Sequence, residues 1–188
     1  EWLRYYYWIM LINRFISPER IVLLQATKKE AALDELINTL CATTEGLDTA
    51  VISKAVWERE ALFSTRIAPA IAVPHAQLPG IQTSYIVVGK SQDGVQYDAK
   101  NDQLVHLVFL LVGSMENHLN LLSGLARLLQ ANDIIDSLLA ANGVHAIYKL
   151  LTEEPSFSQQ ENHVDEIISQ HAGKIADDVH IGAGLAQR

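Results

Sequence analysis

Residues 104–112 read Leu-Val-His-Leu-Val-Phe-Leu-Leu-Val, a nearly continuous apolar run that Gly113 and Ser114 close. A strand with one face in water would show a polar residue at every second position, and this run contains a single histidine. Such a run is typical of a strand at the centre of a sheet whose two faces are both covered. The run therefore predicts a central strand with helices packed on both of its sides.

Helical and extended patterns alternate on either side of this run. Asp48 or Thr49 is expected to cap a helix that ends near Phe63, with Ile52, Val56 and Phe63 facing inward. Asp93-Gly94 is a strong hairpin signal. The sequence predicts strands at 21–24, 70–73, 85–88, 95–97 and 104–112, and helices at 1–16, 28–43, 49–63, 118–131, 133–141 and 143–152. This order predicts an α/β fold, a mixed β-sheet flanked by helices on both faces.

The composition divides the chain into three parts. Residues 1–16 are aromatic and predict an N-terminal helical extension that docks on its own core, on a partner subunit or at a membrane interface, with docking on protein favoured. Residues 17–152 hold the alternating elements and form the main domain. Residues 153–188 form a linker and a C-terminal extension. Because the chain begins with Glu1, we expect it to be a fragment or a processed chain.

Charge and composition argue against several classes of protein. The formal net charge is -8 and no basic stripe occurs, so no nucleic-acid partner is expected. Cys41 is the single cysteine, which excludes an intrachain disulfide and does not suggest secretion. No run of about 20 apolar residues is present, so no complete membrane span is predicted. A cytoplasmic protein is the expectation.

Common cofactor and metal motifs are missing from the sequence. It contains neither a Walker-type loop nor His-Glu-x-x-His, and no good strand precedes Gly182-Ala183-Gly184. His163 and His171 lie eight residues apart on a predicted helix, a placement more typical of solvated side chains than of a metal site. We therefore expect no cofactor and no metal ion.

His75 is the candidate reactive residue. It follows the predicted strand 70–73 and Pro74, at a strand end, where α/β sheets place their ligands. Pro74 restricts the backbone there, because its ring fixes φ and it has no N–H. With an ordinary pKa of about 6.5, a histidine is mostly neutral at cytoplasmic pH and can accept a phosphoryl group. The position alone also fits a structural role, so the surrounding residues decide.

The stretch from Arg59 to Ala76 resembles the phosphorylation-site region of enzyme IIA domains. These belong to the bacterial sugar phosphotransferase system, fructose/mannitol class, which includes the nitrogen-regulatory paralogues. Glu60, Ile67, Ala68 and the run 71–76 fill the family pattern, which ends in apolar-Ala-apolar-Pro-His-small. Residues 118–129 are similar to the family's helix that opens with a second active-site histidine. The resemblance covers about residues 11 to 152 and implies the enzyme IIA fold.

The resemblance implies a phosphoryl carrier. His75 would take the phosphoryl group from the phosphocarrier protein HPr, or its nitrogen-branch paralogue, and give it to an enzyme IIB partner. Arg59 matches the family's active-site arginine, and a guanidinium suits phosphate geometry. His118 stands at a predicted helix start, where a neutral ring would donate a hydrogen bond to the phosphoryl group or to His75.

Ser64, Thr65 and Arg66 complete the expected phosphoryl-binding set. Ser64 and Thr65 offer hydroxyl or backbone donors. Many family members have glycine where Arg66 stands, and this arginine either adds positive charge near the site or points to solvent. If active, the chain would be a phosphohistidine phosphotransferase component.

A second function stays open at this point, that of a non-catalytic cytoplasmic regulatory domain of a larger membrane transporter, anion/bicarbonate exchanger type. The aromatic N-terminus and the C-terminal extension motivate it. The partner would then be a membrane transporter subunit, and the domain would be tethered to the inner face of the membrane. The sequence permits a homodimer without requiring one.

Overall fold

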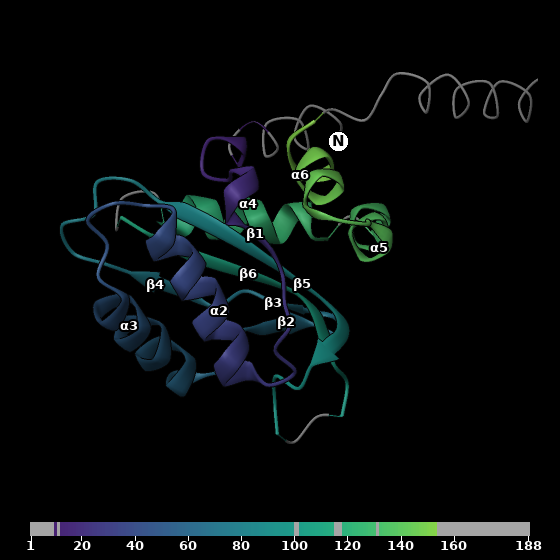
Figure 1. Cartoon of the computed structure of the whole chain (residues 1–188), viewed down its shortest axis with the longest axis horizontal. Helices are drawn as coiled ribbons and strands as arrows, with labels where there is room; N and C mark the ends of the chain where they lie inside the picture. Colours follow the sequence, from purple (N-terminus) through teal and green to yellow (C-terminus); the bar gives the residue numbers. More distant parts are fainter. Residues whose placement is uncertain (1–9, 11, 100–101, 115–117, 131, 154–188) are drawn as a thin grey trace, which may run out of the picture. The chain divides into compact units, whose positions relative to one another are not determined.

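The computed structural model describes residues 10, 12–99, 102–114, 118–130 and 132–153. Within these ranges six strands form one sheet in the order β1-β5-β6-β3-β2, and β4 also pairs with β6 (Figure 1). The strands are β1 (Ile21–Leu23), β2 (Arg66–Ala68), β3 (Ile71–Ala72), β4 (His75–Gln77), β5 (Tyr85–Val95) and β6 (Val105–Gly113). Strand β6 is antiparallel to β5 and parallel to β3 and β4. The predicted central strand and the mixed sheet are confirmed.

Alternate side chains of β6 enter two separate hydrophobic cores, one on each face of the sheet. They are Leu107, Phe109 and Leu111 on one side and Val108, Leu110 and Val112 on the other. The first core is closed by α4 (His118–Leu128), α5 (Asn132–Ala140) and α6 (Val144–Thr152), and the second by α2 (Lys29–Ala42) and α3 (Thr49–Leu62). The prediction of helices on both faces is confirmed (Figure 1).

Helix α3 begins where the sequence predicts a cap. The side chain of Asp48 accepts hydrogen bonds from the backbone N–H groups of Ala50, at 2.8 Å, and Val51, at 3.1 Å. These groups have no partner inside the helix, so a capping carboxylate stabilises the first turn. Asp48 is therefore the cap, and Thr49 is the first residue of α3.

The inner face of α3 differs from its prediction at one position. Its buried residues are Ile52, Val56 and Glu60, spaced by one helical turn, whereas Phe63 is 79% exposed. Because the helix ends at Leu62, Phe63 lies outside it. The residue one turn after Val56, and the last of the buried row, is Glu60. The predicted inward orientation of Phe63 is wrong.

The predicted hairpin at Asp93-Gly94 is also wrong. Strand β5 continues through these residues to Val95, which still pairs with Val105 of β6. Gly94 has a φ of +84° and donates its N–H to Ser91 Oγ over 3.0 Å, and the register shifts between Lys90 and Val95. The Asp-Gly signal instead marks an irregularity within a long strand, where Gly94 adopts the positive φ that glycine tolerates.

The predicted strand 70–73 is shorter than expected, and two short strands flank it. Strand β3 contains only Ile71–Ala72, with β2 before it and β4 after it. Pro74 has no N–H to donate, which interrupts pairing along β6, but its carbonyl accepts from Leu111 N over 2.9 Å. As a result His75 opens β4, where the sequence predicts the end of a strand.

The predicted N-terminal helix can be followed only at its last residues. Ile12 and Ile16 are buried in the core that α4, α5 and α6 cover. Residues 1–9, and the predicted extension from 154 onward, lie outside the described residues. None of the helices in the described ranges combines the length and apolar character needed to span a bilayer.

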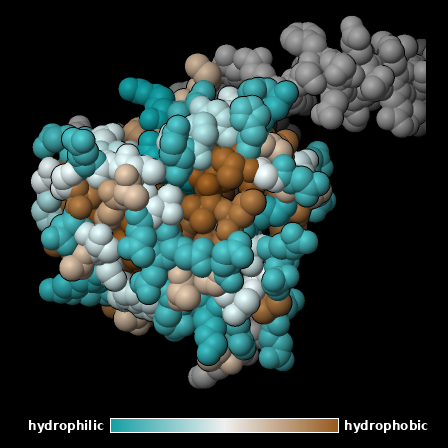
Figure 2. Space-filling view, in the orientation of Figure 1, coloured by the Kyte–Doolittle hydropathy of each residue, from teal (hydrophilic) through white to brown (hydrophobic). Residues whose placement is uncertain are grey.

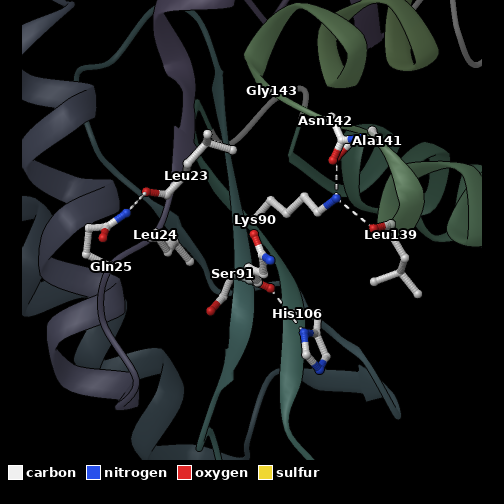
Figure 3. Close-up of a pocket in the computed structure, with 11 residues that line it drawn as sticks. Leu23, Leu24, Gln25, Lys90, Ser91, His106, Leu139, Ala141, Asn142 and Gly143 are labelled. Atoms are coloured by element: carbon white, nitrogen blue, oxygen red, sulfur yellow. Dashed lines mark hydrogen bonds between the residues drawn. The ribbon is translucent and has the colours of Figure 1, made fainter.

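Lys90 of β5 joins the sheet to the end of α5. Its Nζ donates to the carbonyl oxygens of Leu139, at 2.6 Å, and Ala141, at 2.5 Å (Figure 3). These carbonyls lie at the helix C-terminus, where they lack helical partners and favour a cation. The lysine also lines a pocket of about 390 Å³ beside β1. Figure 2 shows apolar side chains exposed in this region, and Leu23 of β1 is 45% exposed.

Replacing Lys90 with methionine is expected to destabilise the domain by about 2 kcal/mol, because two charge-assisted hydrogen bonds are lost. Urea unfolding measures the change. The matched control is Lys54→Met, which removes an exposed ion pair with Glu58 whose atoms lie 3.8 Å apart, and which should cost less than about 0.5 kcal/mol. Equal losses in the two variants would contradict a structural role for Lys90.

Candidate functional site

His75 is half-buried at the start of β4, and its two ring nitrogens have different partners. Nδ1 lies 2.8 Å from the carbonyl oxygen of Val73. A carbonyl can only accept, so in this contact Nδ1 carries the proton and donates. The neutral ring then has its lone pair on Nε2, which is the nitrogen that can attack an electrophile.

Arg59 reaches that nitrogen from the last turn of α3. Its Nε donates to Nε2 of His75 over 3.0 Å, and its Nη1 donates to the carbonyl of Phe63 over 3.1 Å. The bond to the Phe63 carbonyl holds the guanidinium in place, and the bond to His75 fixes its orientation toward Nε2. A guanidinium fixed beside Nε2 is placed to bind the oxygens of a phosphoryl group attached there.

His118 completes the group from the first position of α4. It is buried, and its ring centroid lies 5.4 Å from that of His75 with 49° between the planes. Burial, and to a lesser degree the neighbouring His75, lowers the pKa of His118 to about 4. Its Nδ1 is buried without a hydrogen-bond partner among the described residues. A neutral imidazole whose Nδ1 has no partner among the described residues therefore lies beside the ring of His75.

The surroundings of His75 favour its neutral form. Burial is the main cause that lowers its pKa, and the charge of Arg59 lowers it further. The bond to the Val73 carbonyl and the charge of Glu60 act in the opposite direction but do not cancel the shift. At cytoplasmic pH the Nε2 lone pair is thus available for bond formation.

Acid stability provides a test of the buried state of His118. Its folded pKa lies below the ordinary value of 6.5, so the unfolded chain binds this proton first and stability falls as pH drops from about 6.5 to about 4. His118→Gln should therefore lose about 2 kcal/mol less stability than the wild type between pH 7 and pH 4.5. Urea unfolding at both pH values measures this. The exposed His145 is the control, and His145→Gln should follow the wild type. Identical losses in His118→Gln and the wild type would contradict the prediction.

Two of the remaining predicted residues, Ser64 and Thr65, have other partners. Ser64 Oγ donates to a carboxylate oxygen of Asp98 over 2.7 Å. Thr65 is buried, and its Oγ1 donates to Glu60 Oε2 over 2.6 Å. No hydrogen bond to His75 is found for either side chain in the described ranges, and their phosphoryl-binding role stays a prediction.

Arg66 extends along its own loop. Its Nε donates to the carbonyl of Ala68 over 3.2 Å, and its Nη2 donates to the carbonyl of Pro69 over 2.9 Å and to Gln103 Oε1 over 3.1 Å. The structure brings Arg59, and not Arg66, into contact with His75. The phosphoryl-binding role of Arg66 is likewise still a prediction.

A buried polar cluster behind His75 was not predicted from the sequence. Its centre is Glu60, whose Oε1 lies 3.0 Å from Lys29 Nζ and whose Oε2 also receives the Tyr97 hydroxyl at 3.4 Å. Burial raises the pKa of Tyr97 far above its ordinary value, and the carboxylate of Glu60 adds to the shift. The signal that could have revealed the cluster is a charged residue in register with Ile52 and Val56 on the buried row of a helix.

Metal ligation has no support in the described part of the chain, where no three His, Cys, Asp or Glu side chains are grouped closely enough to hold an ion. The candidate site consists of two neutral imidazoles and one guanidinium. Such a set can carry an anionic group on one ring nitrogen while a fixed cation balances its charge.

Known proteins are similar to this chain in sequence. Residues 14–154 match the family model described as "Phosphoenolpyruvate-dependent sugar phosphotransferase system, EIIA 2". The "PTS system fructose-specific EIIABC component" of Bacillus subtilis is 32% identical over 148 residues, which are 77% of this chain and 23% of that protein. A "Nitrogen regulatory protein" of Bradyrhizobium diazoefficiens is 30% identical over 151 residues, 78% of this chain and 98% of the relative.

Solved structures agree with the fold. The nitrogen regulatory protein IIA-Ntr from Neisseria meningitidis superposes with a TM-score of 0.67 at 25% identity, covering 76% of this chain and 99% of that one. The mannitol enzyme IIA from Escherichia coli, in its complex with phosphorylated enzyme IIB, gives a TM-score of 0.63 at 22% identity and covers 74% of this chain and 98% of that one. The second likeness concerns the fold alone. With a family model that matches most of its length, the chain belongs to the EIIA 2 family of the phosphoenolpyruvate-dependent sugar phosphotransferase system, whose function is phosphoryl transfer between the components of that system.

Proposed function

We propose that Nε2 of His75 takes a phosphoryl group from an HPr-type phosphocarrier and passes it to an enzyme IIB partner. The observation that carries the proposal is the bond from Nδ1 of His75 to the Val73 carbonyl, which leaves the lone pair on Nε2 beside Arg59. That lone pair forms the new nitrogen–phosphorus bond while the bond from phosphorus to the donor breaks, and the departing electron pair stays with the donor. The proton on Nδ1 keeps its carbonyl partner throughout.

Arg59 would change acceptors during the transfer. Once Nε2 is bonded to phosphorus it can no longer accept from Arg59, so the guanidinium donates to the phosphoryl oxygens instead. Its charge offsets the negative charge on those oxygens, which is the main contribution a protein makes to phosphoryl transfer. The bond from Nη1 to the Phe63 carbonyl keeps the group in place while this happens.

His118 would line the other side of the phosphoryl group. Its ring is neutral because burial lowers its pKa to about 4. A neutral ring with the proton on Nδ1 donates one hydrogen bond to a phosphoryl oxygen, which would satisfy the buried atom that has no partner among the described residues. Together, Arg59 and His118 give the incoming group one charged and one neutral donor.

The relatives support the proposed partners. The E. coli mannitol enzyme IIA was solved in complex with phosphorylated enzyme IIB, and a "Multiphosphoryl transfer protein" of E. coli O157:H7 is 27% identical over 149 residues. Relatives named as fructose components and as nitrogen regulatory proteins both match, so the proposal includes sugar uptake and its regulatory branch. It places the chain on the cytoplasmic side, free or fused to a transporter component, and it requires no homodimer.

The deciding experiment is incubation of the chain with phosphoenolpyruvate, enzyme I and HPr, or the nitrogen-branch paralogues of these proteins. We expect one acid-labile phosphate per chain, transferable to enzyme IIB. Absence of labelling, under conditions that label a known enzyme IIA with each donor, would overturn the carrier and favour a non-catalytic regulatory domain.

Phe63 provides a test of where the donor docks. Its side chain is 79% exposed beside Arg59, while only its backbone carbonyl holds the guanidinium. Phe63→Ser should therefore raise the KM for the phosphocarrier about 10-fold and change kcat little, because an exposed aromatic anchor is lost and the catalytic bond remains. Val51→Ser, at a 53% exposed position on α3, the helix that ends just before Phe63, is the control. A fall in kcat at unchanged KM would contradict the docking role.

A further inference from the structure

Glu60 is a buried carboxylate for which the transfer itself has no use. We propose that Glu60 is a positioning residue that fixes the reactive tautomer of His75, acting through the backbone of Thr65 and Val73. The inference rests on the proposed function, since it concerns the nitrogen that receives the phosphoryl group. Arg59 and Glu60 are neighbours on α3. Arg59 contacts His75 directly, whereas Glu60 is connected to it through Thr65 and Val73.

The first link joins Glu60 to Thr65. Oε2 accepts from Thr65 Oγ1 over 2.6 Å, and Oε1 accepts from Thr65 N over 3.2 Å. One carboxylate thus takes both donors of one residue, a bidentate arrangement that fixes the orientation of the peptide. Lys29 Nζ, 3.0 Å from Oε1, balances the buried charge. Glu60 is only 7% exposed, so water cannot easily replace these bonds.

The second link continues from Thr65 to the imidazole. The carbonyl of Thr65 accepts from Val73 N over 2.9 Å, and the carbonyl of Val73 accepts from His75 Nδ1 over 2.8 Å. The next residue, Pro74, has no N–H of its own and is held through its carbonyl by Leu111 N at 2.9 Å. The Val73 N–H is therefore the donor that orients the short segment leading to His75, and its acceptor is set by Glu60.

The tautomer decides the chemistry. A neutral imidazole carries its proton on either nitrogen, and only the form with the proton on Nδ1 presents a lone pair at Nε2 to phosphorus and to Arg59. If the Val73 carbonyl turned away, the alternative form would place a proton at Nε2, where it would face the Arg59 N–H. Glu60 acts on the reaction by keeping that carbonyl in place, without touching the reacting atoms.

The test is a ¹⁵N NMR measurement of the His75 tautomer at pH 8 in the unphosphorylated full chain. The wild type should show the proton on Nδ1. In Glu60→Leu, and to a smaller degree in Thr65→Val, the ratio of the two tautomers should shift toward the Nε2–H form by about 5-fold, the size expected from one lost hydrogen bond. Phosphoryl acceptance should fall in the same order, and Thr65→Ser, which restores the hydroxyl, should recover both.

Tyr97→Phe is the matched control, because it removes a hydroxyl from the same buried cluster but no link of the path to His75. It should leave the tautomer unchanged. An unchanged tautomer ratio in Glu60→Leu would overturn the inference and leave Glu60 a structural residue. If Glu60→Leu does not fold, the same result in Thr65→Val would overturn it. The measurement needs no phosphoryl donor, so its failure is distinct from a failure of the carrier function, which only the labelling experiment decides.

Discussion

Phosphoryl acceptance is expected to disappear when His75 is replaced by glutamine, to below about one-thousandth of the wild-type rate, because no other nucleophile can take over its bond to phosphorus. Glutamine keeps a polar side chain of similar reach but has no basic nitrogen. The bond from Arg59 Nε loses its natural acceptor, yet the half-buried position tolerates a polar group. Transfer of ³²P from phosphoenolpyruvate through enzyme I and HPr measures the loss.

His145→Gln is the control for this substitution, since His145 is exposed on α6 and contributes nothing to the site. It should be labelled at the wild-type rate. Circular dichroism and a cooperative unfolding curve establish that His75→Gln is folded. Full labelling of His75→Gln would show that another residue carries the phosphate, and the assignment of His75 would then be wrong.

Arg59→Gln should slow phosphoryl transfer by about 10²- to 10³-fold, the usual cost of removing one preorganised charged donor from a developing anion. The same change should raise the pKa of His75, because the charge of Arg59 is one of the causes that lower it. The acid limb of the rate profile should move to higher pH accordingly, since more of the ring is protonated at a given pH. An NMR titration of His75 and single-turnover rates from pH 5 to 8 measure the two effects.

Arg66→Gln separates these effects from a general loss of positive charge. Arg66 donates to the carbonyls of Ala68 and Pro69, and no hydrogen bond joins it to His75 among the described residues. The pKa of His75 should therefore stay at its wild-type value. The predicted phosphoryl-binding role of Arg66 gains support if the rate nevertheless falls. An unchanged rate and an unchanged His75 pKa in Arg59→Gln would show that the guanidinium is only a structural link to Phe63.

The local pattern of apolar and polar residues was enough to predict most of the helices and strands. The apolar run 104–112 predicted the central strand, and period-3.6 stripes predicted the helices on either side, because burial on two faces or on one stripe leaves a direct trace in the order of residues. The pattern failed where one signal fits two structures. The positive φ of Gly94 suits a two-residue hairpin and also an irregularity inside a strand. Only the pairing of Val95 with Val105 decides between these two structures.

The sequence by itself determined the fold class, the place of His75 after a proline at a strand boundary, and the candidacy of Arg59 and His118. Only the tertiary structure decided which ring nitrogen of His75 carries the lone pair, and that Arg59 rather than Arg66 faces it. It also decided that Glu60 ends the buried row of α3, whereas the sequence predicts an inward Phe63 at that end of the helix. The physical reason is that periodicity reports how deeply a residue is buried. Which nitrogen carries a proton, and where a guanidinium points, depends instead on partner groups. These groups come close only when α3 packs on β4 and α4 packs on β6 of the same sheet.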